Sequence, residues 1–115
     1  SALQKEAMAP PAETLKSVPS VRGVRAALAR AVTAHEEGRF DEAIAAYNEV
    51  LDLIPRQPDA LQLLGLIAKS RGQYDEAERL MRASLASNPR QPYAAGHLEM
   101  IARLKSARRT AKGAA

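Results

Sequence analysis

The sequence contains no cysteine and no tryptophan among its 115 residues, and its aromatic side chains are limited to three tyrosines and one phenylalanine. Without cysteine the chain forms no disulfide, no zinc-thiolate site and no thiol nucleophile. It also lacks an apolar run of the roughly 20 residues that a transmembrane helix needs, and residues 1–20 lack the continuous apolar stretch of a signal peptide. We therefore expect one small globular domain with a cytoplasmic location, and leave a periplasmic one open.

Acidic residues are absent after Glu99, whereas five basic residues follow it: Arg103, Lys105, Arg108, Arg109 and Lys112. Removing these five from the total of 17 leaves 12 basic residues against 13 acidic ones, so the net charge of +4 belongs to the tail. A basic tail can contact phosphates or acidic lipid, and at a helix end it also complements the helix dipole. We favour the second interpretation because the tail has no aromatic residue for stacking on bases. Neither nucleic acid nor an acidic membrane is therefore the expected partner.

The sequence repeats itself at a spacing of 34 residues. Nine of the 21 positions in segment 38–58 recur in segment 72–92, including the glycine, the Asp-Glu-Ala triplet and the Pro-Arg-Gln-Pro run. Such periods are typical of solenoids. Gly38 and Gly72 are placed to end a helix in the left-handed conformation, and Pro55 and Pro89 stop the helix that follows each glycine. The repeat therefore predicts a unit of helix, tight turn, helix and short loop, at about residues 24–57 and 58–91.

Apolar residues recur every three or four positions along segments 40–53, 59–71 and 74–85, as in amphipathic packed helices. A further helix is predicted from Pro92 to Ser106 or beyond. The predicted fold is all-α, an α-solenoid of antiparallel helix pairs with two units and a C-terminal capping helix at about residues 92–107. The domain spans residues 21–107, between a flexible leader at 1–20 and a basic, frayed tail at 108–115 in which Gly113 ends any helix. Docking of the leader on the domain stays open as an alternative.

These residues resemble the tetratricopeptide repeat family. In the second unit the matching residues are Leu61, Leu64-Gly65, Ala68, Gly72 to Ala77, Leu85 and Pro89. In the first unit they are Ala31, Ala34, Gly38 to Ala43, Tyr47, Leu51 and Pro55. The small residues Gly65 and Ala77 are expected to let two helices approach closely. The usage of alanine, arginine and proline suggests a short domain of bacterial type.

The resemblance implies a right-handed superhelix whose first helices line a concave groove for extended peptides or helices. The side chains expected to line that groove are Arg25, Leu28, Val32, His35, Gln62, Leu66, Lys69, Tyr93, Met100 and Arg103. Members that clamp the terminal carboxylate of chaperones use Lys and Asn where this chain has Leu28 and Val32, so an apolar or amphipathic segment is the better expectation. The alternative, weighed equally, is that Leu28 and Val32 only pack against a neighbouring helix.

Signals of catalysis are absent from the sequence. His35 and His97 stand alone, without cysteine, and are interpreted as surface residues and not as metal ligands. No phosphate-binding or nucleophile-elbow motif occurs. The acidic pairs Asp41-Glu42 and Asp75-Glu76 begin helices, where the helix dipole explains them. We therefore expect no enzyme, no cofactor and no metal.

Three functions remain open from the sequence. The first is a non-catalytic module that binds a protein or peptide partner in its groove. The second is an accessory domain of a larger transferase, of glycosyltransferase or sulfotransferase type. The third is a scaffold that forms homo-oligomers, such as a homodimer, because two and a half repeats give a marginal core. No small-molecule substrate is expected.

Overall fold

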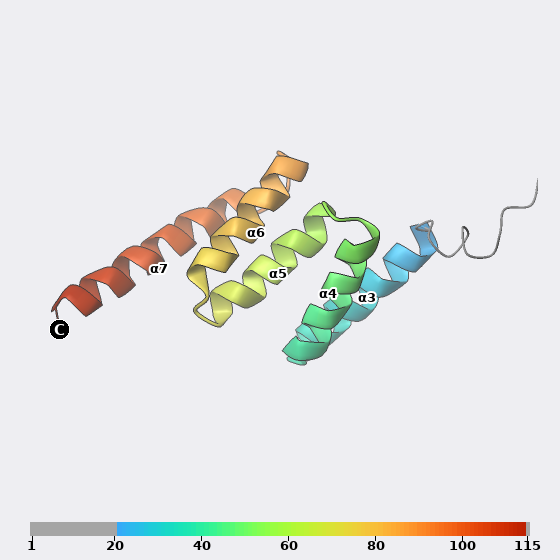
Figure 1. Ribbon diagram of the computed structural model, residues 1–115, viewed down its shortest axis with the longest axis horizontal. Coiled ribbons are helices and arrows are strands. Elements are labelled where there is room, and N and C mark those ends of the chain that lie inside the picture. Colours follow the sequence, from blue (N-terminus) through green and yellow to red (C-terminus); the bar gives the residue numbers. More distant parts are fainter. Residues whose placement is uncertain (1–20, 115) are drawn as a thin grey trace, which may run out of the picture.

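The computed structural model describes residues 21–114 (Figure 1). Within them lie the helices α3 (Val21–Glu36), α4 (Phe40–Leu53), α5 (Pro58–Ser70), α6 (Tyr74–Ser87) and α7 (Ala94–Ala114), and no strand. The predicted all-α solenoid is confirmed. The predicted leader at residues 1–20 lies outside the described residues.

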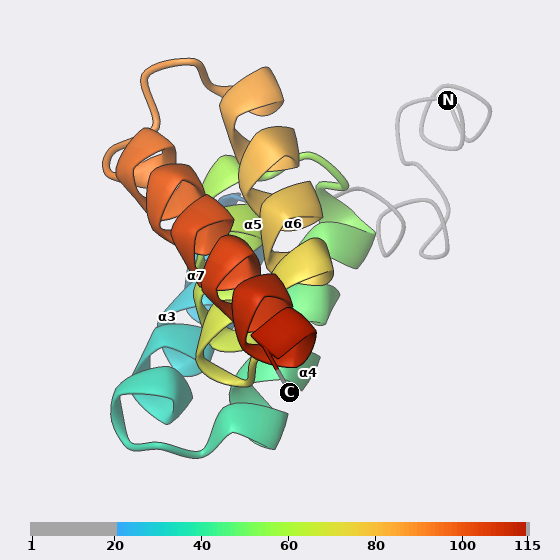
Figure 2. The same ribbon diagram turned by 90° about the vertical axis from the view of Figure 1, so that its left-hand side faces the viewer.

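The helices lie in a row, and each packs against the helices that precede and follow it in the chain. Figure 1 shows the row running from α3 at one end to α7 at the other, and Figure 2 looks along it from the α7 end. α3 pairs with α4 and α5 pairs with α6, whereas α7 packs on α6 and touches α5. The arrangement is two helix pairs followed by a single helix.

A glycine in the left-handed conformation makes the tight turn inside each pair. Gly38 has a φ of 77° and Gly72 a φ of 74°, a backbone region that other residues enter at a cost. The residue after each glycine closes the turn with the same hydrogen bond, from Arg39 N to Ala34 O (2.8 Å) and from Gln73 N to Ala68 O (2.9 Å). The turn that the repeat predicts is therefore present in both units.

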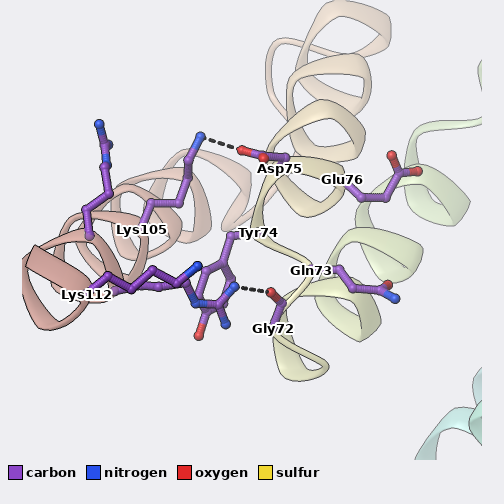
Figure 3. A pocket seen from close by; sticks show the side chains of 9 residues that line it. Gly72, Gln73, Tyr74, Asp75, Glu76, Lys105 and Lys112 are labelled. Atoms are coloured by element: carbon purple, nitrogen blue, oxygen red, sulfur yellow. Dashed lines mark hydrogen bonds and ion pairs between the residues drawn. The ribbon is translucent and has the colours of Figure 1, made fainter. Parts of the chain in front are cut away.

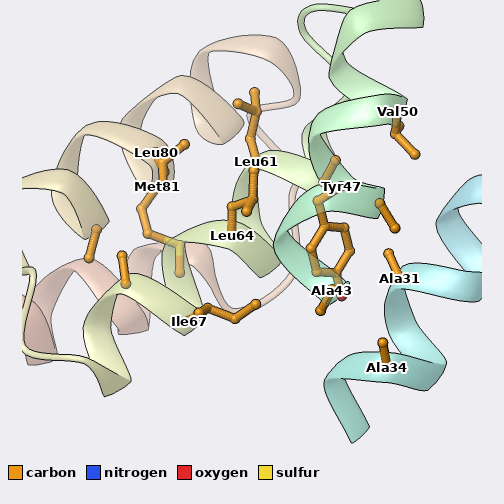
Figure 4. Packing of buried hydrophobic residues seen from close by; sticks show 14 of the residues in the cluster. Ala31, Ala34, Ala43, Tyr47, Val50, Leu61, Leu64, Ile67, Leu80 and Met81 are labelled. Carbon is orange, nitrogen blue, oxygen red and sulfur yellow. The ribbon is translucent and has the colours of Figure 1, made fainter. Parts of the chain in front are cut away.

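The core changes character along the row (Figure 4). Between α3 and α4 it consists of alanines around Tyr47 and Val50, whose side chains are completely buried. Between α5 and α6 it consists of larger side chains, among them Ile67 and Met81. The close approach expected at Gly65 is present, because a β-carbon there would lie only 3.1 Å from Met81 Cε and 3.4 Å from Ala77 O.

α7 differs from the predicted capping helix at both ends. It begins at Ala94 and not at Pro92, because Tyr93 has a φ of 67° and cannot belong to the helix. It ends at Ala114, so residues 108–114 are helical where a frayed tail was predicted. The repeat spacing gives the reason. The position equivalent to the turn glycines is Ser106, and without glycine the helix continues instead of turning back.

In each following unit a basic residue pairs with an aspartate of the preceding unit. Arg71 Nη2 lies 3.1 Å from Asp41 Oδ1, and Lys105 Nζ lies 2.7 Å from Asp75 Oδ1. These two pairs are equivalent under the repeat, since each member is displaced by 34 residues. Both aspartates are exposed, so each pair adds little to stability. They show that successive units meet in the same register.

We expect the buried phenol of Tyr47 to make the fold sensitive to alkali. Tyr47 lies with its hydroxyl 3.1 Å from His35 Nδ1, and burial, with a smaller contribution from Glu36, raises its pKa from 10.0 to about 12. The folded state therefore favours the neutral phenol, so stability is complete below pH 10 and declines as the pH rises towards 12. Denaturant unfolding across this range should show a loss of about 2 kcal/mol from this group.

The control for this measurement is Tyr47→Phe. The variant loses the contact with His35, which costs about 1 kcal/mol near neutral pH, but it has no phenol to ionise. Its stability should consequently fall less than that of the wild type between pH 10 and 12. Equal losses in the two proteins would contradict the assignment.

Candidate functional site

A groove about 340 Å³ in volume crosses three parts of the chain that are distant in sequence. It is lined by two residues of α3, three of α5 and three of the loop before α7: Leu28, Val32, Asp59, Gln62, Leu63, Gln91, Pro92 and Tyr93. Of the ten predicted groove residues, the structure thus brings together Leu28, Val32, Gln62 and Tyr93. We call this feature the groove.

The floor of the groove is apolar. Leu28, Val32 and Leu63 are half-buried and pack against the core with part of their surface. Each therefore serves both roles that the sequence left open for Leu28 and Val32, helix packing and groove lining. Sequence reasoning missed Leu63 as a groove residue.

The loop before α7 is braced against α5 by side-chain hydrogen bonds. Gln62 Nε2 donates to Pro92 O (2.7 Å), and Gln91 Nε2 donates to Asp59 Oδ1 (2.7 Å). Asn88 adds a further bond within the loop, from its Nδ2 to Gln91 Oε1 (3.1 Å). Sequence reasoning missed Gln91 and Pro92, because a loop held by side chains leaves no periodic signal.

Tyr93 stands at the end of this braced loop with 81% of its surface exposed. It is the one residue other than glycine with a positive φ among the residues that the structure describes. Such a conformation costs a tyrosine of order 1 kcal/mol, and the bonds of Gln62 and Gln91 hold the loop that imposes it. The result is an exposed aromatic side chain on a braced backbone beside an apolar floor.

The other predicted residues do not line this groove. Arg25, Met100 and Arg103 are exposed, and Leu66 is half-buried outside it. His35 is half-buried and does not line the groove, because its ring packs edge-on against Phe40 and Tyr47. Burial lowers the pKa of His35, which keeps the ring neutral near pH 7.

Lys69 is engaged outside the groove. Its Nζ lies 3.4 Å from His97 Nδ1. Burial, and then the charge of Lys69, lower the pKa of His97. The neutral imidazole therefore accepts from the ammonium group, and this contact connects α5 with α7.

The described residues contain no cluster of three or more histidine or acidic side chains that could hold a metal ion. Across residues 21–114, every helix is too short or too polar to pass through a membrane.

Comparison with known proteins agrees with the fold. Residues 34–110 match the family model of the tetratricopeptide repeat. No curated protein matches the chain. The matched region holds both glycine turns and the helices α4, α5 and α6 in full. With two thirds of its length covered by that model, the chain belongs to the tetratricopeptide repeat family.

Proposed function

We propose that the chain is a non-catalytic module that holds a segment of a partner protein in the groove. Tetratricopeptide repeats generally mediate protein–protein interaction. The observation that carries the finer proposal is that α3, α5 and the loop before α7 form one hollow with an apolar floor. An apolar floor with polar groups at its edge is the usual composition of a peptide-binding groove.

Tyr93 is the residue that should contribute most to binding. Exposed aromatic side chains are frequent hot spots because they bury a large area at a small entropic cost. The braced loop fixes the backbone of Tyr93 before a partner arrives, so the backbone needs little further ordering on binding. The partner segment should supply apolar side chains for the floor formed by Leu28, Val32 and Leu63.

A display library of random peptides tests the proposal. Peptides selected on the wild-type chain should bind Tyr93→Ala at least about tenfold more weakly, because a hot-spot residue is lost. Leu28→Glu should abolish binding, since it places a charge on the apolar floor. Affinities are measured by titration with labelled peptide, and circular dichroism checks that the variants stay helical.

The matched control is Ile54→Ala. Ile54 is also a large, partly exposed apolar residue in a connection between helices, but it does not line the groove. The same peptides should bind this variant within about twofold of the wild type. Peptides that tolerate both groove substitutions, or that lose affinity equally with the control, would remove the groove as the binding site.

A further inference from the structure

Four basic side chains form one stripe along the last turns of α7. Lys105, Arg108, Arg109 and Lys112 are spaced at i, i+3, i+4 and i+7, which places them on the same face of a helix. The same periodicity places Arg103 on the opposite face. The stripe exists because α7 does not turn at Ser106, so these residues are ordered on a helix.

The stripe forms one wall of a hollow about 420 Å³ in volume, and residues 72–76 at the start of α6 form the other wall (Figure 3). None of these residues lines the groove. The hollow therefore lies apart from the proposed peptide-binding site.

Two of the four cations are held in place by α6 and the turn before it. The guanidinium carbon of Arg108 lies 4.3 Å above the centre of the Tyr74 ring, and Arg108 Nη1 donates to Gly72 O (2.8 Å). Lys105 pairs with Asp75 and also lies 3.5 Å from Glu78 Oε2. These contacts fix the position of the stripe relative to α6.

The other two cations are free to meet a ligand. Arg109 and Lys112 are exposed, and no hydrogen bond or ion pair engages either side chain within residues 21–113. The hollow also contains the carboxylates of Asp75 and Glu76, but these are paired with Lys105 and Arg79 respectively. The lining thus carries four positive and two negative charges, and its unpaired charge is positive.

The basic side chains of the stripe lower the pKa of Asp75, a carboxylate in the same hollow. The hydrogen bond and charge of Lys105 lower the pKa of Asp75, and Arg109 and Arg108 lower it further by their charge. The positive field of the stripe therefore reaches across the hollow to the wall formed by α6.

We propose that this hollow binds an acidic segment of a partner protein, with carboxylate side chains paired to Arg109 and Lys112 and directed by the fixed guanidinium of Arg108. From Lys105 to Lys112 the stripe spans about 10 Å, the length of three or four residues of extended peptide. Asp and Glu residues spaced along such a segment match the separated cations. The uncharged residues between them can then face the carboxylates of α6, which avoids repulsion.

Nucleic acid and membrane fit the hollow less well. A polyphosphate carries charges at fixed short intervals, so it would be repelled by Asp75 and Glu76. The one aromatic ring in the hollow, Tyr74, is covered by Arg108, so none remains for base stacking. No bulky apolar residue stands between the four cations in the sequence, where Ser106, Ala107, Thr110 and Ala111 lie, so this segment offers none for insertion into lipid.

The test uses the whole chain and a fluorescein-labelled peptide of alternating Glu and Ser residues. Fluorescence anisotropy at low ionic strength, where surface charge pairs are least screened, should show saturable binding. The double variant Arg109→Gln/Lys112→Gln should bind at least about fivefold more weakly, since two charge-assisted contacts are lost. Glutamine is a good helix former, so helicity should not change.

A second double variant controls for total charge. Arg56→Gln/Arg90→Gln removes two exposed arginines that occupy equivalent loop positions in the two units, and it should bind within about twofold of the wild type. Amide chemical shifts should change at residues 72–76 when the peptide is added to the wild-type chain. The proposal is overturned by an absence of binding, by equal losses in the two double variants, or by shift changes confined to other residues. Tighter binding of a single-stranded oligonucleotide or an anionic vesicle through Arg109 and Lys112 would assign the stripe to phosphate instead.

Discussion

Replacing Gly65 by leucine should destabilise the domain by about 3 kcal/mol, a large share of the stability of a small domain. The physical reason is the close approach of α5 and α6 at this position. Even a β-carbon would lie 3.1 Å from Met81 Cε and 3.3 Å from Met81 Cγ, and Met81 is completely buried, so it has no space to withdraw into. Denaturant unfolding followed by circular dichroism measures the loss.

Gly96→Leu is the matched control for that substitution. Gly96 is also inside a helix, but a β-carbon there would meet no atom within 4 Å. The same chemical change should therefore be neutral or stabilise by up to about 1 kcal/mol, because leucine favours the helix more than glycine does. A similar loss at both positions would mean that the bulk of the side chain is not what matters at Gly65.

Ile101→Ala should release α7 from the rest of the domain. Ile101 is the one large apolar side chain of α7 that is completely buried, and truncating such a residue costs about 2–5 kcal/mol. The ion pairs of Lys105 with Asp75 and Glu78 lie at the surface and should not compensate, since surface pairs contribute about 1 kcal/mol or less. Hydrogen exchange should show a loss of amide protection along α7, whereas α4 and α5 keep theirs.

Met100→Ala is the corresponding control. Met100 is the neighbour of Ile101 in the chain and is 43% exposed, so its truncation should leave the exchange of α7 nearly unchanged. If the two variants exchange alike, docking of α7 does not depend on Ile101. Release of α7 should also remove the hollow beside the basic stripe, because one of its walls belongs to this helix.

The repeat unit was predictable because its signals are local. A glycine with positive φ and a proline after a helix act through the backbone of a few residues, so Gly38, Gly72 and Pro55 locate the turns without knowledge of the tertiary structure. The helix was predicted to run to Ser106 or beyond, but residues 108–115 were expected to fray, because the lack of a glycine at position 106 was overlooked. Gly113 does not end the helix, since it lies inside α7.

The candidate site was less predictable than the fold. The family resemblance placed Leu28, Val32, Gln62 and Tyr93 in the groove, and the first three lie on helices α3 and α5, whereas Tyr93 lies in the loop before α7. The position of His35 on α3 would also suit a groove residue, but its ring packs against Phe40 and Tyr47. Helical spacing alone does not show whether a side chain points into the groove or packs on the neighbouring helix. The basic stripe was assigned to a frayed tail, because its partner surface at residues 72–76 comes from the preceding helix pair.

The row of helices has a consequence for how the chain reaches its native state. Because almost every contact joins helices that are consecutive in the chain, no distant segments must find each other before contacts form. Domains with such local contacts fold in microseconds to milliseconds. Stability is then a sum over neighbours, so the inner helices α4, α5 and α6, each packed on both sides, should be the last to open. α3 and α7 lie at the ends of the row and are packed on one side only, so unfolding should begin at these two helices.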